Sequence, residues 1–317
     1  MSSLETGLER DPAWPLVSVV LPTRGRPDLV RDALRSVLGQ SYPGEIECVV
    51  VHDQEMPDHS LTGLQGAGRA VRVCTNHRAP GLAGARNTGR DHAVGDFIAS
   101  CDDDDLWHRD KLTVQMQWLR ARPAIWVVGS GIRLMMPGNR VVDWPGRSPV
   151  VLRQDLLRSR VKELHSSTLL VRRETYDWVG GYDEDLPCSY AEDYEWLLRA
   201  VRLGPLGVVT TPLADIRKDA PSWFRERQQV VAEGLEYLLR THPELRESRR
   251  GEARLLGQIA FAHAAIGDRR TAAGWVLRSL RRWPLTPHAA LAAVSIATGL
   301  DPRLSLRTAQ AMGRGLT

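Results

Sequence analysis

The stretch DFIASCDDDDLW, Asp96–Trp107, decides the fold class. Its first part, Asp96–Ser100, is a short apolar run, which is typical of a buried strand. Four aspartates, Asp102–Asp105, follow this strand almost directly. Ligands of open α/β sheets bind beyond the carboxyl ends of the strands. The position of this acid run therefore predicts a ligand site at the edge of a sheet.

The acid run also indicates the kind of ligand. Consecutive carboxylates repel one another, and a divalent cation removes that cost. Mg²⁺ and Mn²⁺ suit hard oxygen ligands and typically bind one or two carboxylates plus substrate phosphates. The structural alternative is an N-cap for a following helix, but a cap needs one aspartate and not four. The run favours a site for Mn²⁺ or Mg²⁺ and a phosphate.

Strand and helix patterns alternate on both sides of the acid run. Apolar runs predict further strands at Leu16–Leu21, Ile46–Val51, Val71–Val73, Ile125–Val128, Ser167–Val171 and Leu206–Thr210. Helical spacing predicts helices at Asp28–Leu38, Leu82–Ala93, Lys111–Arg120 and Asp193–Leu203, and Pro and Gly residues indicate a loop at Val141–Ser148. Such alternation implies βαβ units and a mostly parallel sheet.

The composition changes near Ala220, where Ala, Leu and Arg become dominant and strand patterns stop. Helices are expected at Trp223–Thr241, Gly251–Ile266, Arg270–Trp283 and from His288 onward. One pair resembles a tetratricopeptide hairpin, but it does not repeat. We therefore expect residues 1–14 to be a disordered leader, 15–219 an α/β domain, and 220–317 an all-α extension.

Charge and cysteine content limit the function classes. The formal net charge of +4 is too small to indicate nucleic-acid binding. Residues Arg217–Thr317, however, include 17 Lys and Arg residues and only 9 Asp and Glu residues. This basic tail suits either solvated helix faces or contact with an anionic membrane or acceptor.

Four scattered cysteines without a CxxC pair suggest reduced thiols. No signal peptide or membrane span is evident. A cytoplasmic protein, with membrane association through the basic tail as an option, is expected.

Seven motifs together resemble family 2 glycosyltransferases of the GT-A fold, from about Leu16 to Ser222. They are VSVVLPTRGRP (Val17–Pro27), VVVHDQ (Val49–Gln54), GLAGARNTG (Gly81–Gly89), DDDDLW (Asp102–Trp107), HSSTLLVRRE (His165–Glu174), VGGYDE (Val179–Glu184) and AEDYEWLLR (Ala191–Arg199). Each alone is a weak signal, but seven in the family's order are specific. The resemblance implies a Rossmann-like GT-A domain, with the all-α extension outside it.

The resemblance implies a nucleotide-sugar site. Asp102 and Asp104 match the family's DXD element, with Asp104 as the expected metal ligand and Asp102 or Asp103 near the ribose or the metal. Arg86 matches an arginine that contacts donor phosphate or base, a task that suits a planar guanidinium. The remaining residues expected near the nucleotide are Pro22, Thr23, Arg24, His52 and Asp53.

The resemblance also implies an acceptor site. Asp193 matches the family's general base, which takes the proton of the acceptor hydroxyl as it attacks the anomeric carbon in an inverting transfer. Burial among other acids raises the pKa of a carboxylate toward a useful value. A helix N-cap is the structural alternative for Asp193. His165, Glu192 and Trp196 are expected on the acceptor side, although a lone His or Trp more often packs.

Three departures from the family concern the donor and the metal. His52 replaces the aspartate that commonly reads uracil, and Arg24 replaces an aromatic residue. Asp219 stands where a metal-contacting His is often found, so it is a second expected metal ligand. A UDP-sugar remains the expected donor, and the first two departures put the base in question.

The expected activity is metal-assisted, inverting transfer of a hexosyl group from a nucleotide diphosphate-sugar to a hydroxyl acceptor. Two alternatives remain. A sugar-phosphate nucleotidyltransferase needs a Gly-rich turn after its first strand, and Pro22–Arg26 contains one glycine. A non-catalytic sugar-binding or scaffold protein is disfavoured because Asp104 and Asp193 are both present.

Overall fold

The computed structural model describes residues 14–218 and 227–300. The expected leader lies outside these residues except for Trp14, as do Asp219 and the expected helix start at Trp223. Within the described ranges the chain forms two compact units. The sheet unit comprises residues 14–151, 162–184 and 199–218, and the helical unit comprises 152–161, 185–198 and 227–300.

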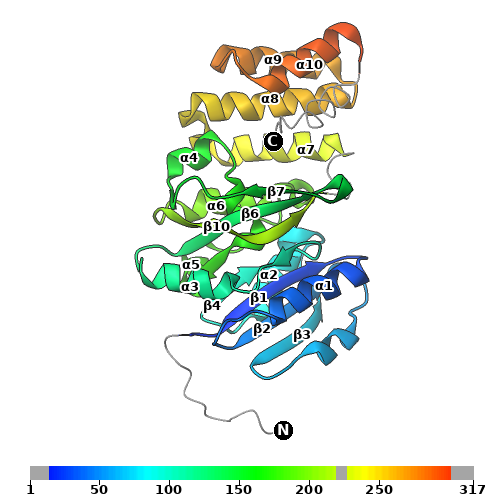
Figure 1. Ribbon diagram of the computed structural model, residues 1–317. Coiled ribbons are helices and arrows are strands. Elements are labelled where there is room, and N and C mark those ends of the chain that lie inside the picture. The colour runs from blue at the N-terminus through cyan, green and yellow to red at the C-terminus, as the bar shows by residue number, and fades with distance from the viewer. Residues whose placement is uncertain (1–13, 219–226, 301–317) are drawn as a thin grey trace. The chain divides into compact units, whose positions relative to one another are not determined.

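The described part of the sheet unit contains a ten-stranded sheet with helices packed on it (Figure 1). The strands are β1 Val17–Thr23, β2 Ile46–His52, β3 Arg69–Thr75, β4 Phe97–Ser100, β5 Leu106–Trp107, β6 Val127–Met136, β7 Arg140–Trp144, β8 Val150–Val151, β9 Leu170–Arg172 and β10 Leu206–Arg217. The helices are α1 Pro27–Leu38, α2 Leu82–His92, α3 Lys111–Arg120 and α5 Arg173–Val179.

The strand order is β3-β2-β1-β4-β9-β6-β10-β5, with β7 on β6 and β8 on β10. The block β3-β2-β1-β4 is parallel, and so is the long pair β6–β10. Short β9 joins the two parallel groups by antiparallel pairing with β4 and β6. The predicted mostly parallel α/β sheet is confirmed. Its antiparallel pairs involve β9, between the two parallel groups, and the short strands β5, β7 and β8.

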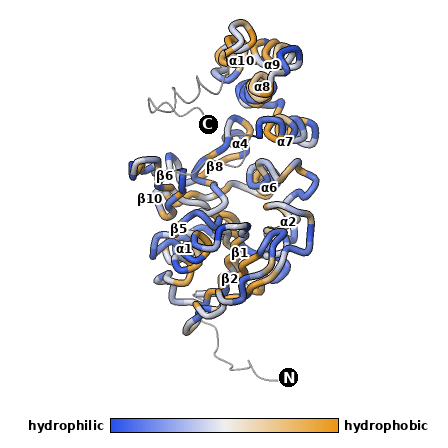
Figure 2. Tube along the Cα trace, turned by 90° about the vertical axis from the view of Figure 1, so that its right-hand side faces the viewer, coloured by the Kyte–Doolittle hydropathy of each residue, from blue (hydrophilic) through white to orange (hydrophobic). Residues whose placement is uncertain are grey.

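The hydrophobic pattern explains the parallel block. Every residue of β1 and β2 is buried, as expected for strands covered on both faces, and these strands form hydrophobic stretches of the trace (Figure 2). In α1, Pro27 occupies the first turn and Val30, Ala33, Leu34 and Val37 form its buried face. Helix α2 lies so close to β1 that a Cβ at Gly89 would collide with Val20. The small residues of α2 thus allow a short helix–strand distance.

Three strand predictions were wrong in detail. The expected loop at Val141–Ser148 contains β7, which forms a hairpin with an extended β6. The expected strand Ser167–Val171 begins as a 3₁₀ turn, Ser166–Thr168, before β9. Strand β10 continues seven residues beyond its expected end at Thr210, because register shifts between Val209 and Ala214 accommodate Pro212.

The helical unit contains α4 Arg153–Arg158, most of α6 Glu192–Ala200, α7 Gln228–Thr241, α8 Arg249–Ala265, α9 Arg269–Arg282 and α10 Pro287–Thr298. The predicted helices of the extension are therefore present. Ser248 and Asp268 cap α8 and α9 by accepting hydrogen bonds from backbone N–H groups. Segments 152–161 and 185–198 group with these helices rather than with the sheet.

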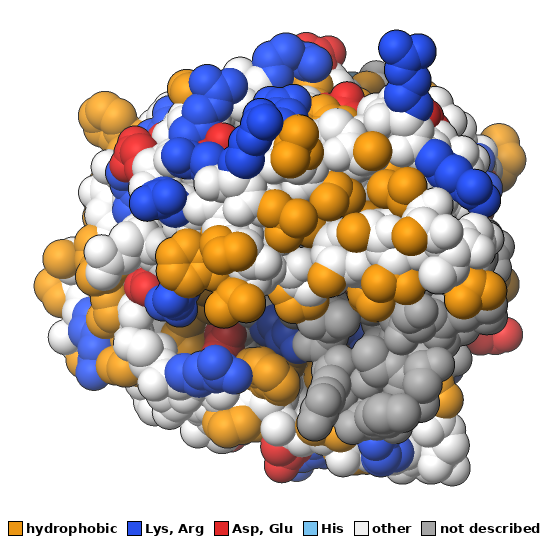
Figure 3. Space-filling view, turned by 90° about the horizontal axis from the view of Figure 1, so that it is seen from above, with side chains coloured by type: hydrophobic (Ala, Val, Ile, Leu, Met, Phe, Trp, Pro, Cys, Tyr) orange, Lys and Arg blue, Asp and Glu red, His pale blue; other side chains and the backbone are white. Residues whose placement is uncertain are grey.

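The surface around α9 and α10 carries many Lys and Arg side chains beside apolar ones (Figure 3). This distribution matches the basic charge balance of the C-terminal sequence. No helix among residues 14–218 and 227–300 is long and apolar enough to cross a membrane. The four cysteines are free thiols, with Cys48 and Cys101 buried.

Candidate active site

The acid run lies at the carboxyl ends of β1 and β4, as its sequence position predicted. The backbone N–H of Cys101 donates to the Val20 carbonyl at 3.0 Å, which extends the parallel pairing to the start of the run. Thr23, the last residue of β1, donates its hydroxyl hydrogen to Asp103 Oδ2 at 2.8 Å. This edge of the sheet is the ordinary ligand-binding edge of an open α/β fold.

Asp102 is held by a buried arginine and a serine. Arg86, only 2% exposed, donates from Nη2 to Asp102 Oδ1 at 2.6 Å. Ser166 donates its hydroxyl hydrogen to Oδ2 at 2.8 Å. Burial opposes ionisation, but the charge of Arg86, the neighbouring His165 and these hydrogen bonds outweigh it, so the pKa of Asp102 is lowered. Asp102 is therefore ionised at neutral pH.

Asp105 has the opposite electrostatic environment. It is buried, Ser167 donates to its Oδ2 at 2.5 Å, and the backbone N–H of Arg217 donates to its Oδ1 at 3.1 Å. Burial and then the charges of Asp102 and Asp104 raise its pKa well above the usual value. A nearby cation would offset both effects.

Asp102, Asp105 and His165 form a cluster with metal-ligand geometry. One ligand atom from each residue lies within 4.8 Å of the other two. His165 Nδ1 accepts a hydrogen bond from the Ser167 backbone N–H at 3.3 Å and lies 3.7 Å from Asp105 Oδ2. Two carboxylates and an imidazole fit a divalent transition ion such as Mn²⁺, and a cation would relieve the repulsion between the carboxylates. The residues present thus fit the expected metal.

Asp103 and Asp104 share a different partner, Arg26. Its Nη1 lies 2.9 Å from Asp103 Oδ1 and 3.0 Å from Asp104 Oδ2. Burial raises the pKa of Asp103 to about 6, whereas a third of the Asp104 side chain is exposed. Asp104, the expected metal ligand, is therefore outside the compact cluster, and its role stays a prediction.

His52 and Asp53 tie the loop after β2 to its surroundings. His52 Nδ1 lies 2.9 Å from Glu55 Oε1, and its Nε2 accepts the N–H of Asp58 at 3.2 Å. Asp53 accepts from Asn76 at 2.8 Å and from the N–H of Gly81, which precedes α2. Both ring nitrogens of His52 are therefore engaged within the protein.

Arg24 is the accessible member of the expected nucleotide-binding set. Pro22 is buried in β1, while 61% of the Arg24 side chain is exposed and its Nη1 is 4.0 Å from Asp53 Oδ2. The turn that carries Arg24 is fixed, because Gly25 N–H donates to Glu55 Oε2 at 2.6 Å. This arrangement presents a guanidinium beside the loop after β2.

Two further family motifs meet in a hydrogen-bonded framework. Asn87 of GARNTG donates to Glu184 Oε1 at 2.6 Å and to the Tyr182 carbonyl at 2.9 Å. The Tyr182 N–H donates back to Asn87 Oδ1 at 2.8 Å. Since α2 also carries Arg86, this framework fixes the arginine that holds Asp102.

Asp193 lies in the first turn of α6, in the helical unit, as the helix prediction indicated. It is half-buried, and its Oδ1 accepts the N–H of Tyr194 at 2.7 Å. The preceding residues Cys188, Ser189 and Ala191 have φ values of 49°, 54° and 73°. Such conformations are costly for residues other than glycine and cluster at functional sites.

The neighbours of Asp193 are buried. Glu192 is 6% exposed. Trp196 is fully buried, which favours packing over the sugar contact expected of it.

The structure brings together Thr23, Arg86, Asp102, Asp103 and His165 of the expected residues. It adds Arg26, Ser166 and Ser167, to which the sequence argument gave no role, and Asp105, which that argument included only as a member of the acid run. Asp105 could have been found, since it belongs to the quoted acid run, and the serines belong to the HSST segment.

Relatives found by sequence are mostly short matches. The chain is 34% identical over 104 residues to the UDP-Glc:alpha-D-GlcNAc-diphosphoundecaprenol beta-1,3-glucosyltransferase WfgD of Escherichia coli, covering 33% of this chain and 41% of that protein. It is 33% identical over 110 residues to the putative teichuronic acid biosynthesis glycosyltransferase TuaG of Bacillus subtilis, covering 34% and 43%. A longer match, 26% over 223 residues, is to the uncharacterized protein y4gI of Sinorhizobium fredii and covers 64% of this chain. The matches span only 24% to 43% of these relatives' lengths.

Solved structures share the fold. The mannosyltransferase PcManGT from Pyrobaculum calidifontis, in complex with GDP-Man and Mn²⁺, has a TM-score of 0.55 at 23% identity, covering 95% of this chain and 86% of that one. S. aureus TarS 1–349 with UDP-GlcNAc has a TM-score of 0.58 at 18% identity, covering 95% and 93%.

The sequence model of Glycosyl transferase family 2 matches residues 18–180, which include β1, the acid run and His165. This is more than half of the chain, and the matched range contains all three members of the Asp102, Asp105 and His165 cluster. The chain therefore belongs to glycosyl transferase family 2.

Proposed function

We propose that this glycosyltransferase moves a hexosyl group from a nucleoside diphosphate-sugar to an acceptor hydroxyl, with inversion and with the help of a divalent cation. The single observation that carries the proposal is the cluster of Asp102, Asp105 and His165 at the carboxyl edge of the sheet. It supplies ligands where the donor diphosphate of this fold is expected.

In this proposal Asp102 and Asp105 bind the cation, and His165 completes the set through an imidazole nitrogen. The imidazole favours Mn²⁺ over Mg²⁺, because Mg²⁺ prefers oxygen ligands. When bound, the cation stabilises negative charge on the leaving diphosphate. Ser166 and Ser167 orient the two carboxylates, and Arg86 keeps Asp102 ionised. Asp104 stays an alternative metal ligand. It would become available to the cation if Arg26 left it and paired with the donor phosphates instead.

The donor base is expected beside Arg24 and the loop after β2. Arg24 is exposed there, and a guanidinium can stack on a base or pair with phosphate. His52 would shape this loop rather than read the base, since both its ring nitrogens are engaged. UDP-sugars remain the first donors to test, followed by GDP-sugars, because structural neighbours were solved with UDP-GlcNAc and GDP-Man.

For the acceptor step we propose Asp193 as the general base. The hydroxyl oxygen bonds to the anomeric carbon, the bond from that carbon to the diphosphate breaks, and the hydroxyl proton passes to the Asp193 carboxylate. The run of positive φ values before α6 supports a constrained position for this side chain. Since WfgD is named for a diphosphoundecaprenol-linked sugar acceptor, lipid diphosphate-linked sugars are the first acceptor class to test.

The test is product analysis with a panel of nucleotide sugars and Mn²⁺. Release of nucleoside diphosphate supports glycosyl transfer, and transfer to a test acceptor establishes it. Release of pyrophosphate would instead indicate a nucleotidyltransferase. Donor binding without any release would indicate the non-catalytic alternative.

A further inference from the structure

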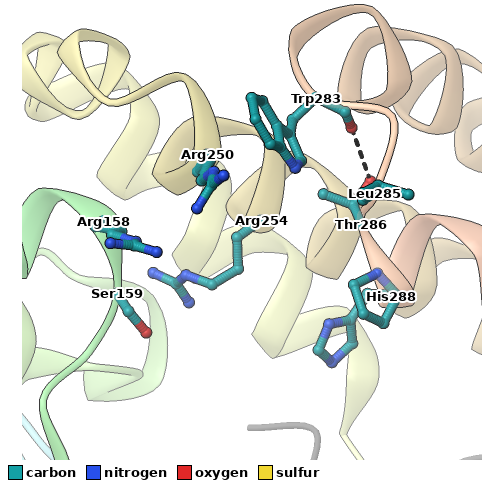
Figure 4. A pocket seen from close by; sticks show the side chains of 9 residues that line it. Arg158, Ser159, Arg250, Arg254, Trp283, Leu285, Thr286 and His288 are labelled. Carbon is teal, nitrogen blue, oxygen red and sulfur yellow. Dashed lines mark hydrogen bonds between the residues drawn. The ribbon is translucent and has the colours of Figure 1, made fainter.

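The helical unit contains a cavity of about 420 Å³. It lies where the end of α4, one face of α8 and the turn between α9 and α10 meet (Figure 4). All the residues that line it belong to the helical unit, so its geometry does not depend on the sheet unit.

Three arginines dominate one wall of this cavity. Arg158 ends α4, and Arg250 and Arg254 lie one turn apart on α8; their side chains converge on the same space (Figure 4). None of the described residues that line the cavity is acidic. Like charges one helical turn apart destabilise a helix, so this arrangement costs stability unless an anion compensates.

Arg254 is the deepest of the three. Its Nη1 donates to Gln258 at 3.0 Å, and the side chain also interacts with the Tyr194 hydroxyl. Its buried Nε and Nη2 nevertheless have no acceptor with good hydrogen-bond geometry among the described residues. Burial lowers the pKa of Arg254 and outweighs the opposite effect of Tyr194, and the charge of Arg160 lowers it further. Buried donors without acceptors are rare in native structures and need an explanation. A ligand that accepts hydrogen bonds would supply one.

Nearby acids are engaged elsewhere. Glu252, on α8, pairs with Arg282, and Glu247 pairs with Arg153 at 2.6 Å. The positive charge of the cavity is thus not cancelled by the adjacent carboxylates.

Packing holds the arginines in this arrangement. Helix α4 packs on α8, and a Cβ at Gly251 would collide with the Leu157 carbonyl. This close approach brings Arg158 next to Arg250 and Arg254. The arginines therefore converge because of the backbone contact and not through flexible surface chains alone.

The opposite wall supplies an aromatic face and neutral polar groups. The Arg250 guanidinium stacks on the Trp283 ring at 4.3 Å. Thr286 is fixed by hydrogen bonds at 3.0 Å to Ser279 and 3.3 Å to the Trp283 carbonyl. Burial and the charge of Arg254 lower the pKa of His288 to about 4, so its ring is neutral at pH 7.

We propose that this cavity binds a diphosphate group, with Arg158, Arg250 and Arg254 as its ligands. Guanidinium forks pair bidentately with phosphate oxygens. A phosphate ester carries about −1.5 to −2 charges near neutral pH. A diphosphate spreads its negative charge over two phosphate groups, so it can pair with three arginines, whereas a single carboxylate cannot. The diphosphate belongs to a soluble ester or to a lipid headgroup. This proposal is independent of the proposed transfer reaction.

The test is calorimetric binding of inorganic pyrophosphate to the full-length protein, with EDTA present to suppress metal-dependent binding elsewhere. Arg158→Gln and Arg250→Gln change exposed side chains and should leave the fold intact. Each should weaken binding by about 10- to 100-fold, the value of a hydrogen bond to a charged group. Arg254→Lys keeps the charge but removes the fork, and should weaken binding as well. Arg278→Gln is the matched control, since Arg278 stacks on Trp275 away from the cavity, and it should bind like the wild type.

A second readout is the His288 ring signal in NMR titrations. Pyrophosphate between Arg254 and His288 would screen the arginine, so the pKa of His288 should rise on binding. Vesicles that contain diacylglycerol diphosphate, with phosphatidylglycerol vesicles as the monophosphate control, identify the source. If the protein binds these vesicles, and if the arginine substitutions and added pyrophosphate both abolish that binding, the site is assigned to lipid headgroups. Pyrophosphate binding without such vesicle binding assigns it to a soluble diphosphate. No pyrophosphate binding, or equal loss in Arg278→Gln, overturns the proposal.

Discussion

The Arg86 guanidinium lies 2.6 Å from the Asp102 carboxylate, and both are anchored by separate family motifs. Asn87 fixes α2 to the VGGYDE segment, while Ser166 and Ser167 fix the acid run to the segment after His165. The ion pair therefore joins four motifs that are distant in sequence. It explains why the candidate metal ligands are preorganised in the protein alone.

The first prediction separates the two assignments of the metal ligands. Asp105→Asn keeps the shape of the side chain and its hydrogen bond with Ser167, but it removes one of the two carboxylates from the compact cluster. We expect the Mn²⁺ affinity to fall by at least about 10- to 100-fold, since even the loss of a supporting group has that effect. Asp104→Asn should reduce it less, because Asp104 pairs with Arg26. Manganese titrations followed by electron paramagnetic resonance measure both variants. A larger loss of Mn²⁺ affinity in Asp104→Asn than in Asp105→Asn would assign the metal to Asp104.

The second prediction concerns the general base. Asp193→Asn keeps the size and the hydrogen bonding of the side chain but removes its ability to take a proton. General-base assistance is worth about 10²–10⁴-fold, so kcat should fall by that factor while donor affinity stays nearly unchanged. If Asp193 only caps its helix, Asn serves almost as well and kcat stays near the wild-type value. Steady-state kinetics with nucleotide binding measured in parallel decide between these roles.

The parallel half of the sheet could be predicted because its strands are buried on both faces and form continuous apolar runs. Strand β7 could not, because it lies between Pro137-Gly138 and Pro145-Gly146 and its residues are mostly exposed. It is stabilised as a strand by pairing with β6. The length of β10 was missed because Pro212 usually ends a strand, whereas a register shift accommodates it here.

The site was predictable where a single motif carried the chemistry. Arg86 and Asp102 belong to recognisable segments, and the structure pairs them. The contact of Asp105 with Ser167 joins residues 62 positions apart, so only the tertiary fold reveals it. Similarly, the cavity of the helical unit depends on α4 packing against α8, two segments that composition assigned to different domains.

The third prediction concerns a buried pair in the helical unit. His242 Nε2 lies 3.1 Å from Glu195 Oε1, and Glu244 is 3.1 Å from its other nitrogen. Burial lowers the pKa of His242, but the hydrogen bonds and charges of the two glutamates outweigh burial and raise it. The charged pair therefore stabilises the fold below the unfolded pKa of about 6.5, and this contribution is lost as the pH rises through the folded pKa.

His242→Gln removes the titrating group and keeps a hydrogen-bond donor. Urea unfolding of the wild type and of His242→Gln is measured from about pH 6 upward. The difference between their free energies of unfolding should become smaller as the pH rises. A constant difference would mean that the histidine contributes by packing only. Unfolding is best followed by Trp fluorescence together with circular dichroism, so that two-state behaviour can be checked.

The last prediction concerns Lys111, which is fully buried in α3. Its Nζ donates to Gln115 Oε1 at 2.8 Å and lies 3.9 Å from the centre of the Trp107 ring. Burial lowers its pKa to about 7, although the nearby Cys101 acts in the opposite direction. In the unfolded chain a lysine keeps its proton up to about pH 10.4. Between about pH 7 and pH 10 the unfolded state therefore binds more protons, and the free energy of unfolding rises with pH because of this group.

Lys111→Met has a similar volume and no charge. It should remove this rise in stability, and near pH 7 it should be more stable than the wild type by up to a few kcal/mol, on the order of the 1.4 kcal/mol per pKa unit that linkage gives. Loss of the Gln115 hydrogen bond offsets about 1 kcal/mol of the gain. Lys111→Arg is the matched control, because it keeps a charge that stays protonated throughout this range. Denaturant unfolding at several pH values measures all three proteins. If the free energy of unfolding of Lys111→Met rises with pH as steeply as that of the wild type, another group titrates in this range. If Lys111→Met is less stable than the wild type at every pH, the buried ammonium is favourable.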